Sequence, residues 1–115
     1  MKRRPHRSLA LAALLLAAAL PTCTSIEAAQ HYRSGTVALD RDDPALAVEE
    51  LERAAVLEPD AAHIQNHLGI AYERVGRRDD ALRAYERAVE LDCENQAAQA
   101  NLVKAKDARA AASVP

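Results

Sequence analysis

Hydrophobic side chains recur every three or four positions through most of the chain after residue 27. In residues 62–75 the apolar positions with this spacing are Ile64, Leu68, Ala71, Tyr72 and Val75. On a helix with 3.6 residues per turn these side chains fall on one side, with polar residues opposite. The pattern therefore predicts an amphipathic helix over residues 62–75.

A second helix is predicted directly after it. Gly76, Arg77 and Arg78 form a turn, and Asp79 can cap the helix that follows over residues 79–91. The side chains expected to point inward from this helix are Ala81, Leu82, Tyr85, Ala88, Val89 and Leu91. Residues 62–91 thus form a helix–turn–helix unit.

The same plan is predicted on both sides of this unit. Residues 28–39 form a helix, residues 40–43 a turn, and Pro44 opens a helix that ends at Leu57, with Pro59 just beyond it. Residues 96 to about 111 form one more helix, which no second helix follows. The predicted fold class is all-α.

The two units repeat with a period of 34 residues. Aligned pairs are Gly35 with Gly69, Ala47 with Ala81, Leu51 with Tyr85, Ala54 with Ala88, and Leu57 with Leu91. A fixed period of this length is the mark of a repeat array. With no Trp or Phe and three Tyr, the core must rely on small residues at close helix crossings, so Gly69 is expected to face Ala81.

These residues resemble the tetratricopeptide repeat family. The positions that match its pattern are Gly35, Ala47 and Ala54 in the first unit, and Leu68, Gly69, Tyr72, Ala81, Tyr85 and Ala88 in the second. Cys93 stands where the family has proline. The resemblance implies a short right-handed α-solenoid with repeats at 28–61 and 62–95, a capping helix at 96–112 and a tail at 113–115. The alternative for the last helix is pairing with the same helix of a second molecule.

The start of the chain predicts a signal peptide over residues 1–22, followed by a short leader at 23–27. Lys2, Arg3, Arg4 and Arg7 form a basic head before a charge-free run of leucine and alanine at residues 9–20. Twelve helical residues cannot cross a hydrocarbon core of about 30 Å. The expected location is therefore outside the cytoplasm, either in the periplasm or anchored to a membrane of a bacterial envelope.

Cys23 is a candidate site for lipid attachment. Leu20 stands three residues before it, as in bacterial lipoprotein signals, whereas Pro21 and Thr22 are unusual there. Simple cleavage a few residues later is the alternative. A lipidated Cys23 would anchor the domain to one leaflet without embedding it.

The net charge of the chain after the predicted signal peptide indicates which class of partner to expect. Residues 24–115 carry 11 basic and 17 acidic side chains, a net charge of −6. Nucleic acid, whose phosphates require a basic surface, is therefore not an expected partner. Protein partners remain open.

Catalytic, cofactor and metal sites are not predicted. The chain has no glycine-rich phosphate loop and no nucleophile elbow. His63 and His67 have a spacing that can hold zinc, but the sequence offers no clear third ligand nearby, so two groove-lining or solvent-facing histidines are expected. Cys93 is expected to be a small, partly buried residue, with pairing between chains as the alternative.

The family resemblance also implies a concave binding groove formed by the first helix of each unit. Its residues here would be Tyr32, Thr36, Leu39, His63, Asn66, Ile70, Glu73, Arg74 and Lys104, with Ala29, Asp40, Ala97 and Ala100 beside them. Exposed Tyr32, Leu39 and Ile70 among polar neighbours would suit a helix or extended peptide of another protein. The implied function is a non-enzymatic adaptor. The alternatives are that these residues pack against the leader or a second copy, the latter giving a structural homo-oligomer.

Overall fold

The computed structural model describes residues 20–115, with side chains from Cys23 onward. This part of the chain consists of helices joined by short turns and contains no strand. The helices are α2 (Leu20–Asp40), α3 (Pro44–Leu57), α4 (Ala62–Arg74), α5 (Arg78–Leu91) and α6 (Gln96–Ala112). The predicted all-α fold is confirmed.

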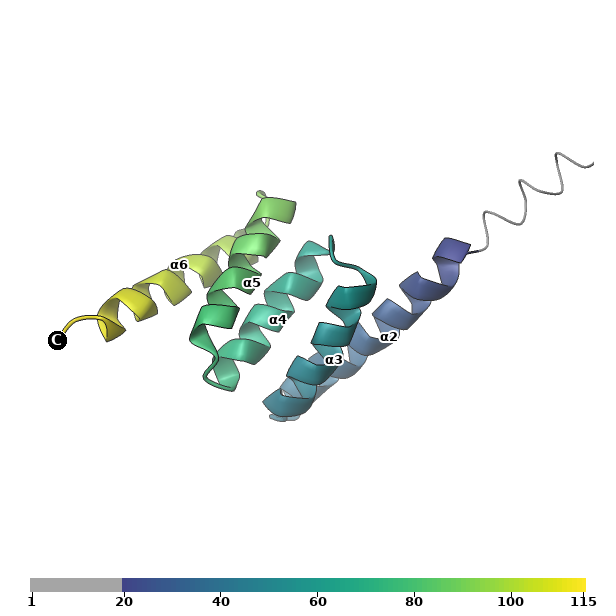
Figure 1. The fold of residues 1–115 in the computed structure, drawn as a ribbon, viewed down its shortest axis with the longest axis horizontal. Coiled ribbons are helices and arrows are strands. Elements are labelled where there is room, and N and C mark those ends of the chain that lie inside the picture. Colours follow the sequence, from purple (N-terminus) through teal and green to yellow (C-terminus); the bar gives the residue numbers. More distant parts are fainter. Residues whose placement is uncertain (1–19) are drawn as a thin grey trace, which may run out of the picture.

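The helices lie side by side in chain order, as Figure 1 shows. Each packs against the next, so that α2 pairs with α3 and α4 pairs with α5. In addition, α2 touches α4 and α4 touches α6. The first helices of successive units are therefore neighbours and form one layer, with α3 and α5 in the other.

Helix boundaries follow from local residues. The Asp43 side chain accepts a hydrogen bond from the Leu46 amide at 3.2 Å, and Pro44 supplies the first turn of α3. Asn95 caps α6 by accepting from the Ala98 amide at 3.0 Å. After α4, Gly76 takes a positive φ of 79°, which glycine adopts at little cost.

The N-cap predicted for α5 is wrong. The helix begins at Arg78, and Arg77 occupies the N-cap position without a side-chain capping bond. Asp79 lies inside the first turn with Asp80. Their carboxylates there interact favourably with the positive end of the helix dipole instead of bonding a free amide.

The beginning of α2 also differs from the prediction. Residues 23–27, predicted as a short leader, belong to α2 and are exposed. Burial begins at Ala28, the predicted start of the first repeat, which is 1% exposed. Residues 1–19, and with them most of the predicted signal peptide, lie outside the described residues. Within residues 20–115 no helix has the length and apolarity needed to cross a membrane.

The core is built mainly from alanine and leucine. Fully buried side chains at the predicted repeat positions are Ala47, Leu51, Ala54, Ala81, Tyr85 and Ala88. Leu68 is 6% exposed, and Tyr72 is half-buried. Small side chains allow the helices to approach closely, and Tyr85 is the largest of the fully buried side chains.

The two helical glycines make room for a large side chain from the second helix of their own unit. A Cβ atom on Gly69 would lie 2.4 Å from Cε1 of Tyr85, and one on Gly35 would lie 2.5 Å from Cγ of Leu51. The three atoms nearest to that Cβ of Gly69 all belong to the Tyr85 ring. The prediction that Gly69 faces Ala81 is therefore corrected: Gly69 faces Tyr85, whose ring fills the space that a side chain at position 69 would occupy.

Candidate functional site

The predicted groove residues lie on α2, α4 and α6, the three helices that neighbour one another in the first layer. Their exposure separates them into three groups. Exposed members are Ala29, Asp40, His63, Arg74, Ala97, Ala100 and Lys104, and half-buried members are Tyr32, Thr36, Ile70 and Glu73. Buried members are Leu39 and Asn66.

Leu39 does not line the groove as an exposed apolar residue. It is 6% exposed and belongs to the core cluster with Leu51 and Leu68. Tyr32 and Ile70 pack against the same cluster and are only partly accessible. The expectation of an exposed Leu39 is wrong because the last turn of α2 is covered by its neighbouring helices.

Tyr32 forms an aromatic cluster with two histidines of α4. Its ring meets those of His63 and His67 edge to face, at centroid distances of 4.8 and 5.3 Å. The Tyr32 hydroxyl lies 3.3 Å from Nδ1 of His67, which is 3.0 Å from the His63 carbonyl. The shorter contact favours a proton on this nitrogen, which donates to the carbonyl. Burial raises the pKa of Tyr32, so its hydroxyl stays neutral.

This cluster is not assembled as a metal centre. Among the described residues there is no group of three or more His, Cys, Asp or Glu side chains placed to hold a metal ion. One nitrogen of His67 is already engaged with the His63 carbonyl. The histidines instead bring a polar, aromatic surface to the junction of α2 and α4.

The first helices are tied together by a second polar pair at the next junction. Nδ2 of Asn101 on α6 donates to Oδ1 of Asn66 on α4 at 2.9 Å. Asn66 is 7% exposed, so this predicted groove residue serves the α4–α6 contact. Asn66 and Asn101 are 35 residues apart in the sequence, and so are Tyr32 and His67, whose contact joins α2 to α4.

The end of α4 supplies two further predicted residues, and each is held by a neighbour. Nη1 of Arg74 donates to the Leu39 carbonyl at 2.8 Å. The Tyr85 hydroxyl donates to Oε2 of Glu73 at 2.8 Å. Burial, followed by this hydrogen bond, raises the pKa of Tyr85.

A basic hollow opens beside these residues, between the end of α4, the start of α5 and α6. Its volume is about 290 Å³. The lining residues are Glu73, Arg74, Arg78, Leu82, Lys104, Ala105, Ala108 and Arg109. Sequence reasoning named Glu73, Arg74 and Lys104 but missed Arg78 and Arg109.

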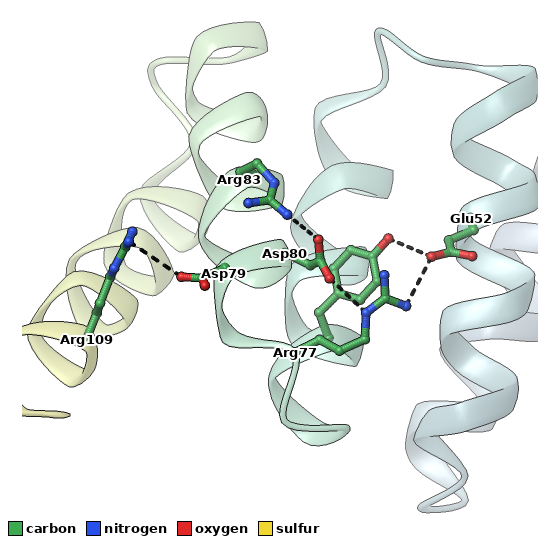
Figure 2. Close-up of polar contacts among 7 residues, drawn as sticks. Glu52, Arg77, Asp79, Asp80, Arg83 and Arg109 are labelled. Atoms are coloured by element: carbon green, nitrogen blue, oxygen red, sulfur yellow. Dashed lines mark hydrogen bonds and ion pairs between the residues drawn. The ribbon is translucent and has the colours of Figure 1, made fainter. Parts of the chain in front are cut away.

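A separate charged network joins α3, α4 and α5 (Figure 2). The Tyr72 hydroxyl donates to Oε1 of Glu52 at 2.7 Å, and the Arg77 guanidinium lies 4.5 Å from the centroid of the Tyr72 ring. Arg77 also donates to Asp80 at 2.8 Å and lies 3.5 Å from Glu52. Burial and then the Glu52 bond raise the pKa of Tyr72 to about 12. The network connects the first repeat to the second.

Both cysteines are free thiols and both are exposed. The expected partial burial of Cys93 is therefore wrong. Cys93 lies in the turn between α5 and α6, where its carbonyl accepts a hydrogen bond from the Gln99 side chain.

Comparison with known proteins agrees with this geometry. A family model described as tetratricopeptide repeat matches residues 32–92 and 68–106. The TPR repeat-containing protein PA4299 of Pseudomonas aeruginosa is 41% identical to the chain over 73 residues. The match covers 60% of this chain and 29% of that protein, so the chain spans less than a third of the relative's length.

Proposed function

Since the chain belongs to the tetratricopeptide repeat family, we propose that it is a protein-binding adaptor that holds a segment of another protein along α2, α4 and α6. Repeats of this family generally mediate protein–protein interactions, and its members are typically not enzymes. We also propose which surface of this chain binds the partner and in which compartment the chain is located.

One observation carries the proposal. The neighbouring first helices present exposed side chains, among them His63, Arg74 and Lys104, and the partly accessible ring of Tyr32 lies beside His63. Aromatic and basic residues together on one face suit recognition of a peptide or helix, since rings supply contact area and charges supply orientation. We call this face the groove.

Two matched charge substitutions test the groove. His63→Glu places a carboxylate on the exposed surface of α4, and Val56→Glu places one on α3, where Val56 is 80% exposed. Crosslinking pull-down from envelope extracts, with quantitative mass spectrometry, should lose the specific partner with His63→Glu and retain it with Val56→Glu. Equal capture by both variants, with helicity intact, would count against the groove.

A structural homo-oligomer is the second candidate function. Val103 on α6 occupies the position of Gly35 and Gly69 and is 59% exposed, which leaves an apolar side chain for a second copy to cover. Size-exclusion chromatography with light scattering over a range of concentrations separates the two functions. A monomer at every concentration would rule out the oligomer.

We propose further that the domain is exported into a bacterial envelope. The basic head and apolar run before Cys23 support this. Cys23 is exposed and lies before Ala28, where burial begins among the side chains that the structure describes, so an attached lipid would not disturb the core. Mass spectrometry of the mature N-terminus decides between a diacylated Cys23 and simple cleavage, and a chain that keeps Met1 and occurs only in the cytoplasmic fraction would contradict export.

A further inference from the structure

The basic hollow concentrates positive charge in an acidic domain. Four basic side chains line it, Arg74, Arg78, Lys104 and Arg109, against a single lining carboxylate, Glu73. Residues 24–115 as a whole have a net charge of −6. The local excess is therefore opposite in sign to that of the surrounding molecule.

Most of this charge is not neutralised inside the protein. The side chains of Arg78 and Lys104 make no hydrogen bond or ion pair with another described residue. Arg109 forms one ion pair, with Asp79, in which nitrogen and oxygen are 3.7 Å apart, longer than a hydrogen bond (Figure 2). Glu73 is already engaged by the Tyr85 hydroxyl.

The preceding junction offers an internal comparison, because each lining residue has a counterpart 34 positions earlier. The counterparts of the charged residues Glu73, Arg74, Arg78, Lys104 and Arg109 are Leu39, Asp40, Pro44, Ile70 and Val75. At that junction Leu39 is buried in the core and Ile70 packs against it. Lys104 and Arg109 at the second junction thus stand where the first has apolar Ile70 and Val75, and Glu73 stands where the first has the buried Leu39.

One lining side chain is much shorter than its counterpart at the first junction. At the first junction Arg74 reaches back from α4 and donates to the Leu39 carbonyl at 2.8 Å. Its counterpart at the second junction is Ala108, which lines the hollow and is too short to reach the corresponding carbonyl of Glu73. A methyl group replaces a guanidinium, and the space between α4, α5 and α6 stays open.

We propose that the basic hollow receives an acidic side chain, Asp or Glu, from the protein segment bound in the groove. The inference rests on the proposed function and names the chemistry of the partner at this end of the groove. A carboxylate in the hollow would accept charge-assisted hydrogen bonds from Arg78 and Lys104, whose side chains have no ion pair with a described residue, and from Arg109, whose ion pair with Asp79 is 3.7 Å long.

Size and position favour a side chain of a bound segment as the occupant. A space of about 290 Å³ is too small for a folded element, and Lys104 belongs to both the groove and the hollow. The acidic remainder of the domain repels a broadly acidic partner, so one local contact fixes the register of the segment instead of driving general attraction.

The test uses defined peptides and needs no identified partner. The purified full chain, labelled with ¹⁵N, is titrated at low salt with a capped peptide that carries a single glutamate and with the same peptide carrying glutamine in its place. The glutamate peptide should shift the amide signals of Arg78, Lys104 and Arg109, and the glutamine peptide should not. Lys104→Gln should weaken binding about tenfold, whereas Arg33→Gln, an equal loss of charge on exposed α2, should leave it unchanged.

Ala108→Arg separates the hollow from general electrostatics. The variant adds a positive charge, so attraction alone predicts tighter binding of the glutamate peptide. An arginine there can fill the hollow as Arg74 fills the first junction, so we expect binding to be lost.

Three results would overturn the inference: tighter binding by Ala108→Arg, equal losses in Lys104→Gln and Arg33→Gln, or inorganic phosphate binding as strongly as the peptide. Its failure is distinguishable from failure of the groove. If the glutamate peptide does not bind but His63→Glu still abolishes partner capture, the groove stands and the acidic contact falls.

Discussion

Gly69 shows how one absent side chain shapes this protein. In a helix interior glycine costs about 1 kcal/mol relative to alanine, so propensity alone favours replacing it. The Tyr85 ring occupies the space beside it, and the ring is fixed by complete burial and by the bond to Glu73. The glycine is therefore explained by packing.

We predict that Gly69→Ala destabilises the fold by about 1–3 kcal/mol, because the new Cβ would lie 2.4 Å from the Tyr85 ring. Gly35→Ala should cost a similar amount, because its new Cβ would lie 2.5 Å from Cγ of the fully buried Leu51 and 3.3 Å from the Leu51 backbone nitrogen. Urea unfolding monitored by circular dichroism measures both. A gain in stability from Gly69→Ala would contradict the packing account.

Tyr72 makes the stability of the fold sensitive to alkaline pH. Its hydroxyl ionises near pH 10 when unfolded, whereas burial and the Glu52 bond raise its folded pKa to about 12. Between these values the folded state binds more protons, so the free energy of unfolding falls as pH rises. Below pH 10 this contribution is fully present.

Tyr72→Phe should therefore reduce the pH dependence of the free energy of unfolding above pH 10. The slope should not vanish, because the pKa of Tyr85 is also raised by burial and by Glu73. Urea midpoints measured below and above pH 10 for both proteins provide the comparison. An unchanged slope in Tyr72→Phe would show that Tyr72 does not carry this linkage.

At the scale of the element, the helices differ in how their N-termini are satisfied. Asp43 and Asn95 accept hydrogen bonds from the first turns of α3 and α6. Ala61 stands at the N-cap of α4 with an extended backbone (φ −91°, ψ 102°) and no side-chain cap. A serine there would have the conformation that capping requires.

Two substitutions test the effect of N-capping on stability, one that removes a capping side chain and one that adds one. Asn95→Ala should destabilise the fold by about 1 kcal/mol through loss of the bond to the Ala98 amide. Ala61→Ser should stabilise it by a similar or smaller amount, about 0.5–1 kcal/mol. Thermal unfolding of both variants beside the parent protein is the measurement, and a loss of stability in Ala61→Ser would mean that the α4 terminus is satisfied in another way.

The same elements show what the sequence can predict. The bounds of α3 follow from Pro44 and the turn before it, because capping chemistry is local. The early start of α2 escaped prediction because Pro21, which ends the apolar run, is also tolerated in the first turn of a helix. The burial of Leu39 was not predicted, because groove positions were assigned from α2 alone. The neighbouring helices that cover the last turn of α2 were not considered.

At the scale of the molecule, the second junction departs from the first at charged positions. The repeat pattern predicts that the helices meet in the same way twice, and it does so from small residues such as Ala54 and Ala88. It does not predict the basic hollow, which at position 108 is lined by the short side chain of Ala108. Comparing Arg74 with Ala108 across the period is the signal by which the sequence could have revealed it.

The network around Arg77 bridges α3 to α4 and α5, and so connects the two repeats (Figure 2). The side chains of Arg77, Glu52 and Asp80 are 48%, 44% and 31% exposed, so solvent screens each ion pair and each contributes little by itself. Together with the Tyr72 ring they hold the two repeats in one relative orientation. A fixed orientation keeps α2, α4 and α6 aligned for a single bound segment.

Site-specific photo-crosslinking in cells tests the groove most directly. A photoreactive residue replaces His63 in one strain and Val56 in another, because the two positions are exposed on α4 and α3 respectively. We predict a defined crosslinked partner from position 63 and none from position 56. The same crosslink from both positions, or crosslinks from position 63 only to a second copy of this chain, would contradict the adaptor function.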